Sequence, residues 1–216
     1  MALKSKAFNI NNNFVVSLDG PAAAGKSTIG RLLADKLQLT YFQSSRVYRS
    51  LALSCINNKI DPNDKDTIIK LSQTLRMVES TELNAENIGI VASQVASISE
   101  VRNNLGKYLV ELINTTPRII MEGRDIGTII APSADLKIFI DADIKMRAER
   151  RYQELYQNNT QYMLSDILSQ LEMRDKMDKE RNTAPLMIPK GALEIDTSYL
   201  IPTEVVDKII EFISVN

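Results

Sequence analysis

Residues 14–28 read FVVSLDGPAAAGKST, and this stretch decides the fold. The apolar run Phe14–Leu18 ends at Asp19 and Gly20, which predicts a buried strand that leads into a turn. Apolar residues then recur at helical spacing from Ser27 to Leu37, which predicts an amphipathic helix. A strand, a turn of small residues and a helix in this order are typical of α/β proteins.

The turn itself matches the pattern G-x-x-x-x-G-K-[ST]. Small residues are required there because backbone N–H groups must turn inward around phosphate oxygens, with the positive end of the helix behind them. Lys26 is expected to bridge the β- and γ-phosphates, and the Ser27 hydroxyl to bind Mg²⁺. A chance match is the alternative, but the flanking strand and helix favour a nucleoside triphosphate site. Its expected residues are Gly20, Pro21, Ala22, Ala23, Ala24, Gly25, Lys26, Ser27 and Thr28.

Further apolar runs predict the rest of the sheet. They lie at 40–42, 118–121, 136–140 and 193–195, and helical patterns such as 144–156 and 203–213 separate them. Strands that alternate with helices predict a five-stranded parallel sheet with helices on both faces, the α/β architecture of P-loop NTPases.

The domain organisation follows from the same patterns. We expect one domain over residues 14–216, with a core formed by 14–56 and 117–216. Residues from about 57 to 116 are helix-rich without a clear strand run, which predicts a helical insert. Residues 1–13 are predicted to be a disordered polar tail.

Composition excludes several classes of function. The chain has 216 residues, no histidine, and 26 Lys+Arg against 27 Asp+Glu. Ser-His-Asp triads and His-ligated zinc are therefore excluded, and the near-zero net charge argues against nucleic acid or membrane partners. Cys55, the single cysteine, lies in an apolar run and is expected to be a reduced core thiol. No apolar stretch reaches the roughly 18 residues of a membrane span, and no signal peptide is recognisable, so a cytoplasmic, monomeric protein is expected.

Arginine placement is the second informative feature. On a helix from Ile167 to Arg181, an apolar stripe continues into Arg174, Asp178 and Arg181. A buried stripe that becomes charged needs compensating charge, and a dianionic phosphate suits two guanidinium groups. The alternative is a solvated face with an Arg174–Asp178 pair.

Arg147, Arg150 and Arg151 share one face of the helix that begins at Ile144. Beside a triphosphate site they suggest a mobile lid, over about 143–182, that carries positive charge to ATP. A salt-bridged surface helix with an Arg150–Glu154 pair is the alternative.

Two short segments add candidates for the second half of a site. Glu122-Gly123-Arg124-Asp125 follows a strand, so Glu122 is expected near Mg²⁺ and Arg124 and Asp125 at the mouth of the crevice, unless this is a turn with an exposed ion pair. Ser97–Glu100 is a capping-box pattern and predicts a helix break. Such a break would let Ser93 and Arg102 converge on one ligand.

Asn58-Lys59-Ile60-Asp61 fits the guanine-reading pattern of GTPases. It follows a helical run, and no D-x-x-G element lies between it and Lys26. We interpret it as a helix terminus with an exposed turn.

Taken together, these motifs resemble those of bacterial cytidylate kinases, a family of P-loop nucleoside monophosphate kinases. The resemblance covers about Val15 to Ile213. It rests on the loop at 20–28 and on VYR at 47–49, ASQVA at 92–96, VR at 101–102, GRDIGT at 123–128, KIF at 137–139, the Arg174–Arg181 segment and APL at 184–186.

The resemblance implies roles that the chemistry supports. Ser93, Arg102 and Asp125 would read cytosine, because a carboxylate accepts from the N4 amino group that uracil lacks. The remaining residues implied to bind the monophosphate substrate are Ser44, Tyr48, Arg49, Arg124, Arg174, Asp178 and Arg181. Lys26, Arg49, Arg124, Arg174 and Arg181 are implied to act in phosphoryl transfer, and Ser27 and Glu122 at the metal.

Three departures from the family pattern stand out. Gln43-Ser44-Ser45 occupies positions where the family usually has D-S-G, with Arg46 as an extra cation after it, and Glu122 stands in place of an Asp. The insert is also short between about Val78 and Ile88, so the small antiparallel sheet usual there is expected to be reduced or absent.

The resemblance implies ATP-dependent phosphorylation of CMP and dCMP in pyrimidine nucleotide metabolism, with Mg²⁺. A monophosphate acceptor is already anionic, so the lack of histidine fits a reaction that needs no general base. The alternatives are a P-loop kinase of a small hydroxylated metabolite such as shikimate, with Asp125 as base, and a GTPase switch that uses Asn58–Asp61.

Overall fold

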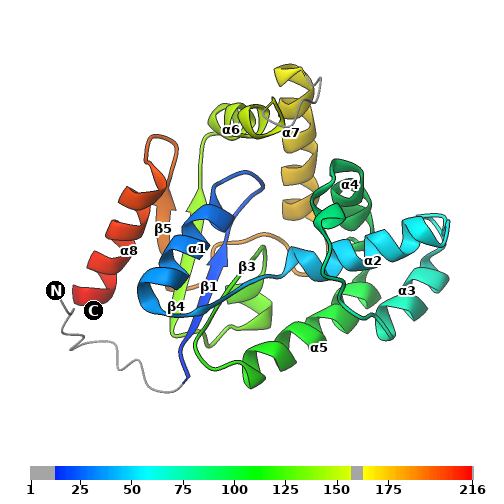
Figure 1. Ribbon diagram of the computed structural model, residues 1–216, viewed down its shortest axis with the longest axis horizontal. Coiled ribbons are helices and arrows are strands. Elements are labelled where there is room, and N and C mark those ends of the chain that lie inside the picture. Colours follow the sequence, from blue (N-terminus) through cyan, green and yellow to red (C-terminus); the bar gives the residue numbers. More distant parts are fainter. Residues whose placement is uncertain (1–12, 157–162, 216) are drawn as a thin grey trace.

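The computed structural model describes residues 13–156 and 163–215. The expected tail at 1–13 therefore lies, apart from Asn13, outside the described residues, as does part of the expected lid. Figure 1 shows a sheet flanked by helices, with a group of helices at one end and a pair of helices above it.

The five strands form one parallel sheet, as predicted. Their order is β2-β3-β1-β4-β5, with bounds β1 (Val15–Asp19), β2 (Thr40–Gln43), β3 (Ile119–Gly123), β4 (Leu136–Asp141) and β5 (Leu193–Asp196). β1 lies in the middle, and its last residue, Asp19, pairs with Gly123 of β3 and Phe139 of β4. The loops that follow β1, β2 and β3 therefore meet at one edge of the sheet.

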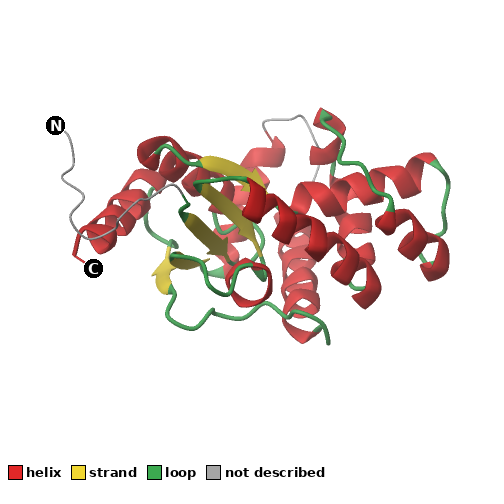
Figure 2. Cartoon of the chain, turned by 90° about the horizontal axis from the view of Figure 1, so that it is seen from below, coloured by secondary structure: helices red, strands yellow, loops and turns green. Residues whose placement is uncertain are grey.

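Helices cover both faces of the sheet (Figure 2). On one face, α1 (Lys26–Leu37) and α8 (Pro202–Val215) pack on a core that includes Val16, Leu18 and Ile138. On the other face, α5 (Ser99–Thr115) packs on Ile119 and Met121, because alternate residues of a strand point to opposite faces. Both sides of β3 are thus buried, which explains its apolar run Ile119–Met121.

The helical insert contains α3 (Lys65–Gln73), the short helix η1 (Thr81–Asn84), α4 (Glu86–Val95) and α5. α2 (Ser45–Asn57) packs along α4, so in space the helical group begins at Ser45. Within residues 57–116, whose backbone the structure describes throughout, there is no strand, in agreement with the expected loss of a small sheet. Cys55 is a buried free thiol in the same core, as predicted.

Two helices complete the fold, and we call them the lid helices because they lie in the region expected to be a lid. α6 (Ile144–Tyr156) has the predicted bounds, and α7 (Leu164–Glu180) begins before the predicted Ile167. They share a small core of Ala22, Ala148, Ile167 and Leu171, which joins them to the loop after β1. No helix in the described ranges has both the length and the apolar character needed to cross a membrane.

Candidate active site

The loop between β1 and α1 has the geometry that its sequence predicts. Gly20 has φ 151°, and a Cβ there would lie 1.9 Å from the Ile140 carbonyl oxygen, so only glycine fits. Gly25 and Ala23 also have positive φ, at 90° and 59°. These angles bend the backbone into a cradle at the N-terminus of α1, where the helix dipole favours anions.

Lys26 is buried at the bottom of this cradle and donates to the Pro21 carbonyl at 2.5 Å. Burial, and then the Arg124 guanidinium, hold the pKa of Lys26 well below its ordinary value. An ammonium in this position lacks a sufficient negative partner, which a polyphosphate would supply.

The Ser27 hydroxyl and Glu122 fit a divalent cation. Ser27 Oγ donates to Glu122 Oε1 at 2.9 Å, and Gln43 Nε2 lies 3.4 Å from the same hydroxyl. Glu122 Oε2 is buried without a hydrogen-bond partner among the described residues. Gln43 and Glu122 are register partners on β2 and β3, so two of the sequence departures meet beside Ser27.

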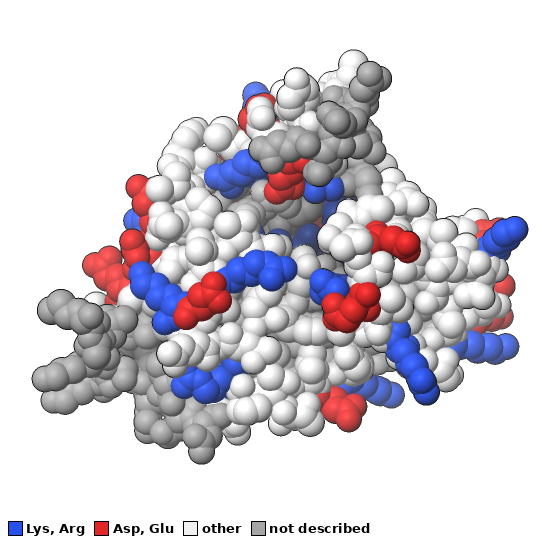
Figure 3. All heavy atoms as spheres, viewed as in Figure 1, with Lys and Arg blue, Asp and Glu red and all other residues white. Residues whose placement is uncertain are grey.

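A cleft of about 740 Å³ opens over the cradle. Figure 3 shows a hollow between the lid helices and the helical insert, with Lys and Arg side chains in and around it. Among the predicted site residues, those that line the cleft are Ala22, Ala23, Ala24, Gly25, Lys26, Ser27, Thr28, Arg49, Ser93, Glu122, Arg124, Arg150, Arg151 and Arg174.

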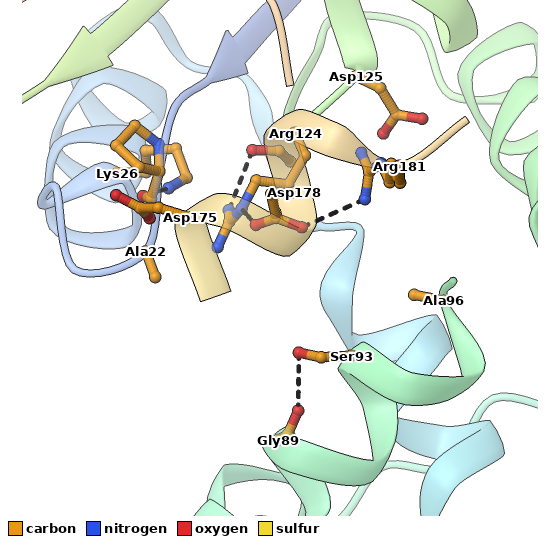
Figure 4. A network of polar contacts seen from close by, with 12 residues as sticks. Ala22, Lys26, Gly89, Ser93, Ala96, Arg124, Asp125, Asp175, Asp178 and Arg181 are labelled. Atoms are coloured by element: carbon orange, nitrogen blue, oxygen red, sulfur yellow. Dashed lines mark hydrogen bonds and ion pairs between the residues drawn. The ribbon is translucent and has the colours of Figure 1, made fainter. Parts of the chain in front are cut away.

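Three charged side chains form a network next to the cleft (Figure 4). Asp178 of α7 accepts from Arg124 Nε at 2.9 Å and from Arg181 Nη1 at 3.2 Å. Burial raises the pKa of Asp178, but Arg124, Arg174 and Arg181 together bring it below its ordinary value. Asp178 therefore stays ionised and holds the guanidinium groups of Arg124 and Arg181 in place.

Asp125 pairs with Arg102 in a buried ion pair, and the Arg102 guanidinium lies over the Tyr48 ring, 5.4 Å from its centroid. Burial raises the pKa of Tyr48 to about 12. Ser44 is buried close by, with its hydroxyl beside Gly123. The predicted site residues that do not line the cleft are Gly20, Pro21, Ser44, Tyr48, Arg102, Asp125, Arg147, Asp178 and Arg181.

Ser93 approaches from the opposite side. Its hydroxyl donates to the Gly89 carbonyl at 3.1 Å on α4, across open space from Arg124 and Asp125 (Figure 4). α4 ends at Val95 and α5 begins at Ser99, so the predicted break is present. The predicted capping box is absent from this break. Ser97 Oγ donates to the Gln94 carbonyl instead, and no side chain caps α5.

The lid arginines differ most from the sequence interpretation. Arg147 is buried and bound to Asp175, so it does not line the cleft as a free cation for ATP. Arg150 donates to the Thr197 carbonyl and hydroxyl, and it is Arg151 that pairs with Glu154, at 3.0 Å. The alternative interpretation paired Arg150 with Glu154, whereas the structure pairs Arg150 with Thr197, on the loop after β5, and Glu154 with Arg151.

Two other sequence features have structural explanations. Arg46 pairs with Glu79 at 2.7 Å, outside the cradle. Asn58 ends α2 and donates to the Ser54 carbonyl at 2.7 Å, so the GTPase-like segment is a helix terminus, as interpreted. Two carboxylates were not predicted as site residues: that of Asp19 accepts from the backbone N–H groups of Ile126 and Gly127, and that of Asp175 binds Arg147. Both partners are distant in the sequence, so no local pattern indicates them.

Comparisons with known proteins agree with this arrangement. A sequence model of the family described as cytidylate kinase matches residues 16–215. Cytidylate kinase from Rickettsia canadensis is 57% identical over 100% of this chain and 99% of its own, and that from Rickettsia africae is 57% identical over 98% and 96%. A gluconokinase from Sinorhizobium meliloti superimposes with a TM-score of 0.53 at 13% identity, over 94% of this chain and 91% of its own, which shows the fold alone.

Proposed function

The chain belongs to the cytidylate kinase family, and from this premise we propose that it transfers the γ-phosphoryl group of ATP to CMP and dCMP. The observation that carries this proposal is the shared cleft. Lys26 and Ser27 of the cradle, Ser93 of α4, and the arginines Arg124 and Arg174 all line it. Such a cleft can hold two nucleotides end to end.

The donor half rests on the residues of the cradle. Backbone N–H groups of 22–27 and the Lys26 ammonium bind the β- and γ-phosphates, and Arg150 and Arg151 line the donor side of the cleft. Ser27 and Glu122 would hold Mg²⁺, which neutralises charge on the phosphate oxygens when it is bound. Arg147 contributes by fixing the Ala22 carbonyl, at 3.2 Å from Nη1.

The acceptor half uses charge in place of a base. A monophosphate oxygen is already a nucleophile near neutral pH, so the reaction needs alignment and stabilisation of spreading charge. Arg49, Arg124 and Arg174 line the cleft and would contact the acceptor phosphate and the transferred group. Arg181 would support them through Asp178.

Cytosine would be recognised by the Arg102–Asp125 pair together with Ser93, with Tyr48 and Ser44 nearby. In the structure Asp125 forms a buried ion pair with Arg102, which fixes the position of its carboxylate oxygens. The N4 amino group of cytosine satisfies such an acceptor and the uracil carbonyl does not. The same ion pair argues against the alternative in which Asp125 is a general base for an alcohol.

The test is turnover in a coupled assay with saturating Mg·ATP and CMP, dCMP, UMP, AMP or shikimate as acceptor. We expect turnover with CMP and dCMP to be at least about tenfold faster than with the other acceptors. The reason is that one unmatched buried hydrogen-bonding group costs roughly 1–3 kcal/mol. Faster turnover with shikimate, or tight GTP binding without phosphoryl transfer, would overturn the proposal.

A further inference from the structure

Asp19 is a buried carboxylate that none of the steps above uses. It is the last residue of β1 and has no exposed surface. Its Oδ1 accepts from the backbone N–H of Ile126 at 2.8 Å, and its Oδ2 accepts from that of Gly127 at 2.7 Å. Each oxygen thus binds one of two consecutive backbone amides at the start of the short helix η2 (Ile126–Ile130).

These amides directly follow the residues proposed to act on the acceptor. Arg124 and Asp125 lie between Gly123, which is the register partner of Asp19 on β3, and Ile126. The strand pairing fixes the segment at one end, and the Asp19 carboxylate fixes it at the other. The backbone that carries both side chains therefore has little freedom to shift.

The segment also lies very close to β1. A Cβ on Gly127 would come within 2.6 Å of Ser17 Oγ and 2.8 Å of Pro189 Cγ. Glycine at 127 therefore permits the approach that brings the amides to Asp19. Ser17 touches the same glycine, but its hydroxyl is buried without a hydrogen-bond partner among the described residues, so Asp19 alone on β1 supplies the polar connection.

We infer that Asp19 is a positioning residue for the acceptor half of the site: it sets the placement of Arg124 and Asp125 through the backbone amides of Ile126 and Gly127. This inference rests on the proposed function. Gly20, the first residue of the phosphate cradle, follows Asp19 directly, so one strand end organises both halves of the cleft. Both hydrogen bonds of the carboxylate go to the acceptor segment.

The protonation state of Asp19 agrees with this role. Burial raises its pKa to about 6, with a further rise from Asp125, whereas the two backbone amides and Lys26 oppose the rise. Above that pH the group is ionised and accepts with both oxygens, and hydrogen bonds to an ionised acceptor are shorter and stronger than neutral ones.

The test is Asp19→Asn, with Ser17→Ala as the matched control on the same strand. Asparagine keeps the shape but turns an NH₂ group toward one backbone N–H. We expect kcat/KM for CMP to fall about 10- to 100-fold, the loss expected for a hydrogen bond to a charged group. The preference for CMP over UMP should fall with it, while the KM for ATP stays within about twofold. Ser17→Ala should behave as the wild type.

The inference would be contradicted if Asp19→Asn weakened the kinetics toward ATP as much as toward CMP, or if kcat/KM for CMP did not fall. Hydrogen exchange on the wild-type protein provides a test that does not depend on a stable variant: the amides of Ile126 and Gly127 should be strongly protected, and rapid exchange there would refute the inference. Wild-type turnover with CMP tests the proposed function separately, so the two failures are distinguishable.

Discussion

Arg147 of α6 and Asp175 of α7 face each other in a buried bidentate pair, with nitrogen–oxygen distances of 3.2 and 2.6 Å. The same guanidinium donates to the carbonyls of Ala142 and Ala22. One side chain thus joins both lid helices to the phosphate cradle.

The first prediction concerns this pair. Asp175→Ala should lower the free energy of unfolding by about 3–5 kcal/mol, because it leaves the Arg147 charge buried and unpaired. Urea unfolding measures the change. The exposed pair Lys36–Asp207 is the control, and Asp207→Ala should cost less than about 1 kcal/mol. Similar costs for the two variants would mean that the buried pair has no special role.

The second prediction concerns Glu122. Glu122→Gln should weaken Mn²⁺ binding to the enzyme–nucleotide complex about 10- to 100-fold, because it removes a charged oxygen next to Ser27. Electron paramagnetic resonance of Mn²⁺ gives the affinity without reference to turnover. Gln43→Ala, at the neighbouring register position, should have a much smaller effect. An unchanged affinity in Glu122→Gln would place the metal elsewhere.

The third prediction concerns the protonation of Lys26. Its pKa is lowered in the free protein by burial and Arg124, and bound phosphates should raise it again. At a pH between the pKa of Lys26 in the free protein and its higher pKa in the complex, nucleotide binding should therefore take up protons. The affinity for nucleotide should increase as the pH falls through this range. Calorimetry in buffers of different ionisation enthalpy measures the uptake. Lys26→Met should reduce it, and identical uptake in this variant would assign the protons to another group.

The fourth prediction concerns Arg124, which lines the cleft and is held by Asp178. Arg124→Ala should lower kcat by about 10³-fold or more, in the range found for arginines that stabilise phosphoryl transfer. Arg46→Ala, outside the cradle, should retain normal kcat. If Arg124→Ala stayed within a few-fold of the parent, Arg124 would have no role in the transition state.

The five strands and the helices α1, α6, α7 and α8 could be predicted because local apolar patterns mark them, whereas the helices within 57–116 were expected only as a helix-rich region without bounds. The bounds of α6 agree to the residue, and β1 is displaced by one residue from the predicted Phe14–Leu18. The phosphate cradle is equally local, since its glycines and Lys26 lie within one short motif.

Partners that are distant in the sequence could not be predicted in the same way. Arg147 binds Asp175 at a separation of 28 residues, Arg150 binds Thr197 at 47, and Asp19 binds Ile126 at 107. Only the parallel register brings Asp19 beside the segment after β3. A helical wheel therefore places the three arginines of α6 on one face, but it gives no information about which of them are bound to other residues of the protein.

The central claim is that cytosine is recognised between Ser93 of α4 and the Arg102–Asp125 pair. A crystal structure with CMP and a non-hydrolysable ATP analogue tests it most directly. We expect the pyrimidine ring within hydrogen-bonding distance of Ser93, Arg102 and Asp125, and the phosphates of the two nucleotides facing each other beside Lys26 and Arg124. A pyrimidine ring bound away from those three side chains would contradict the account.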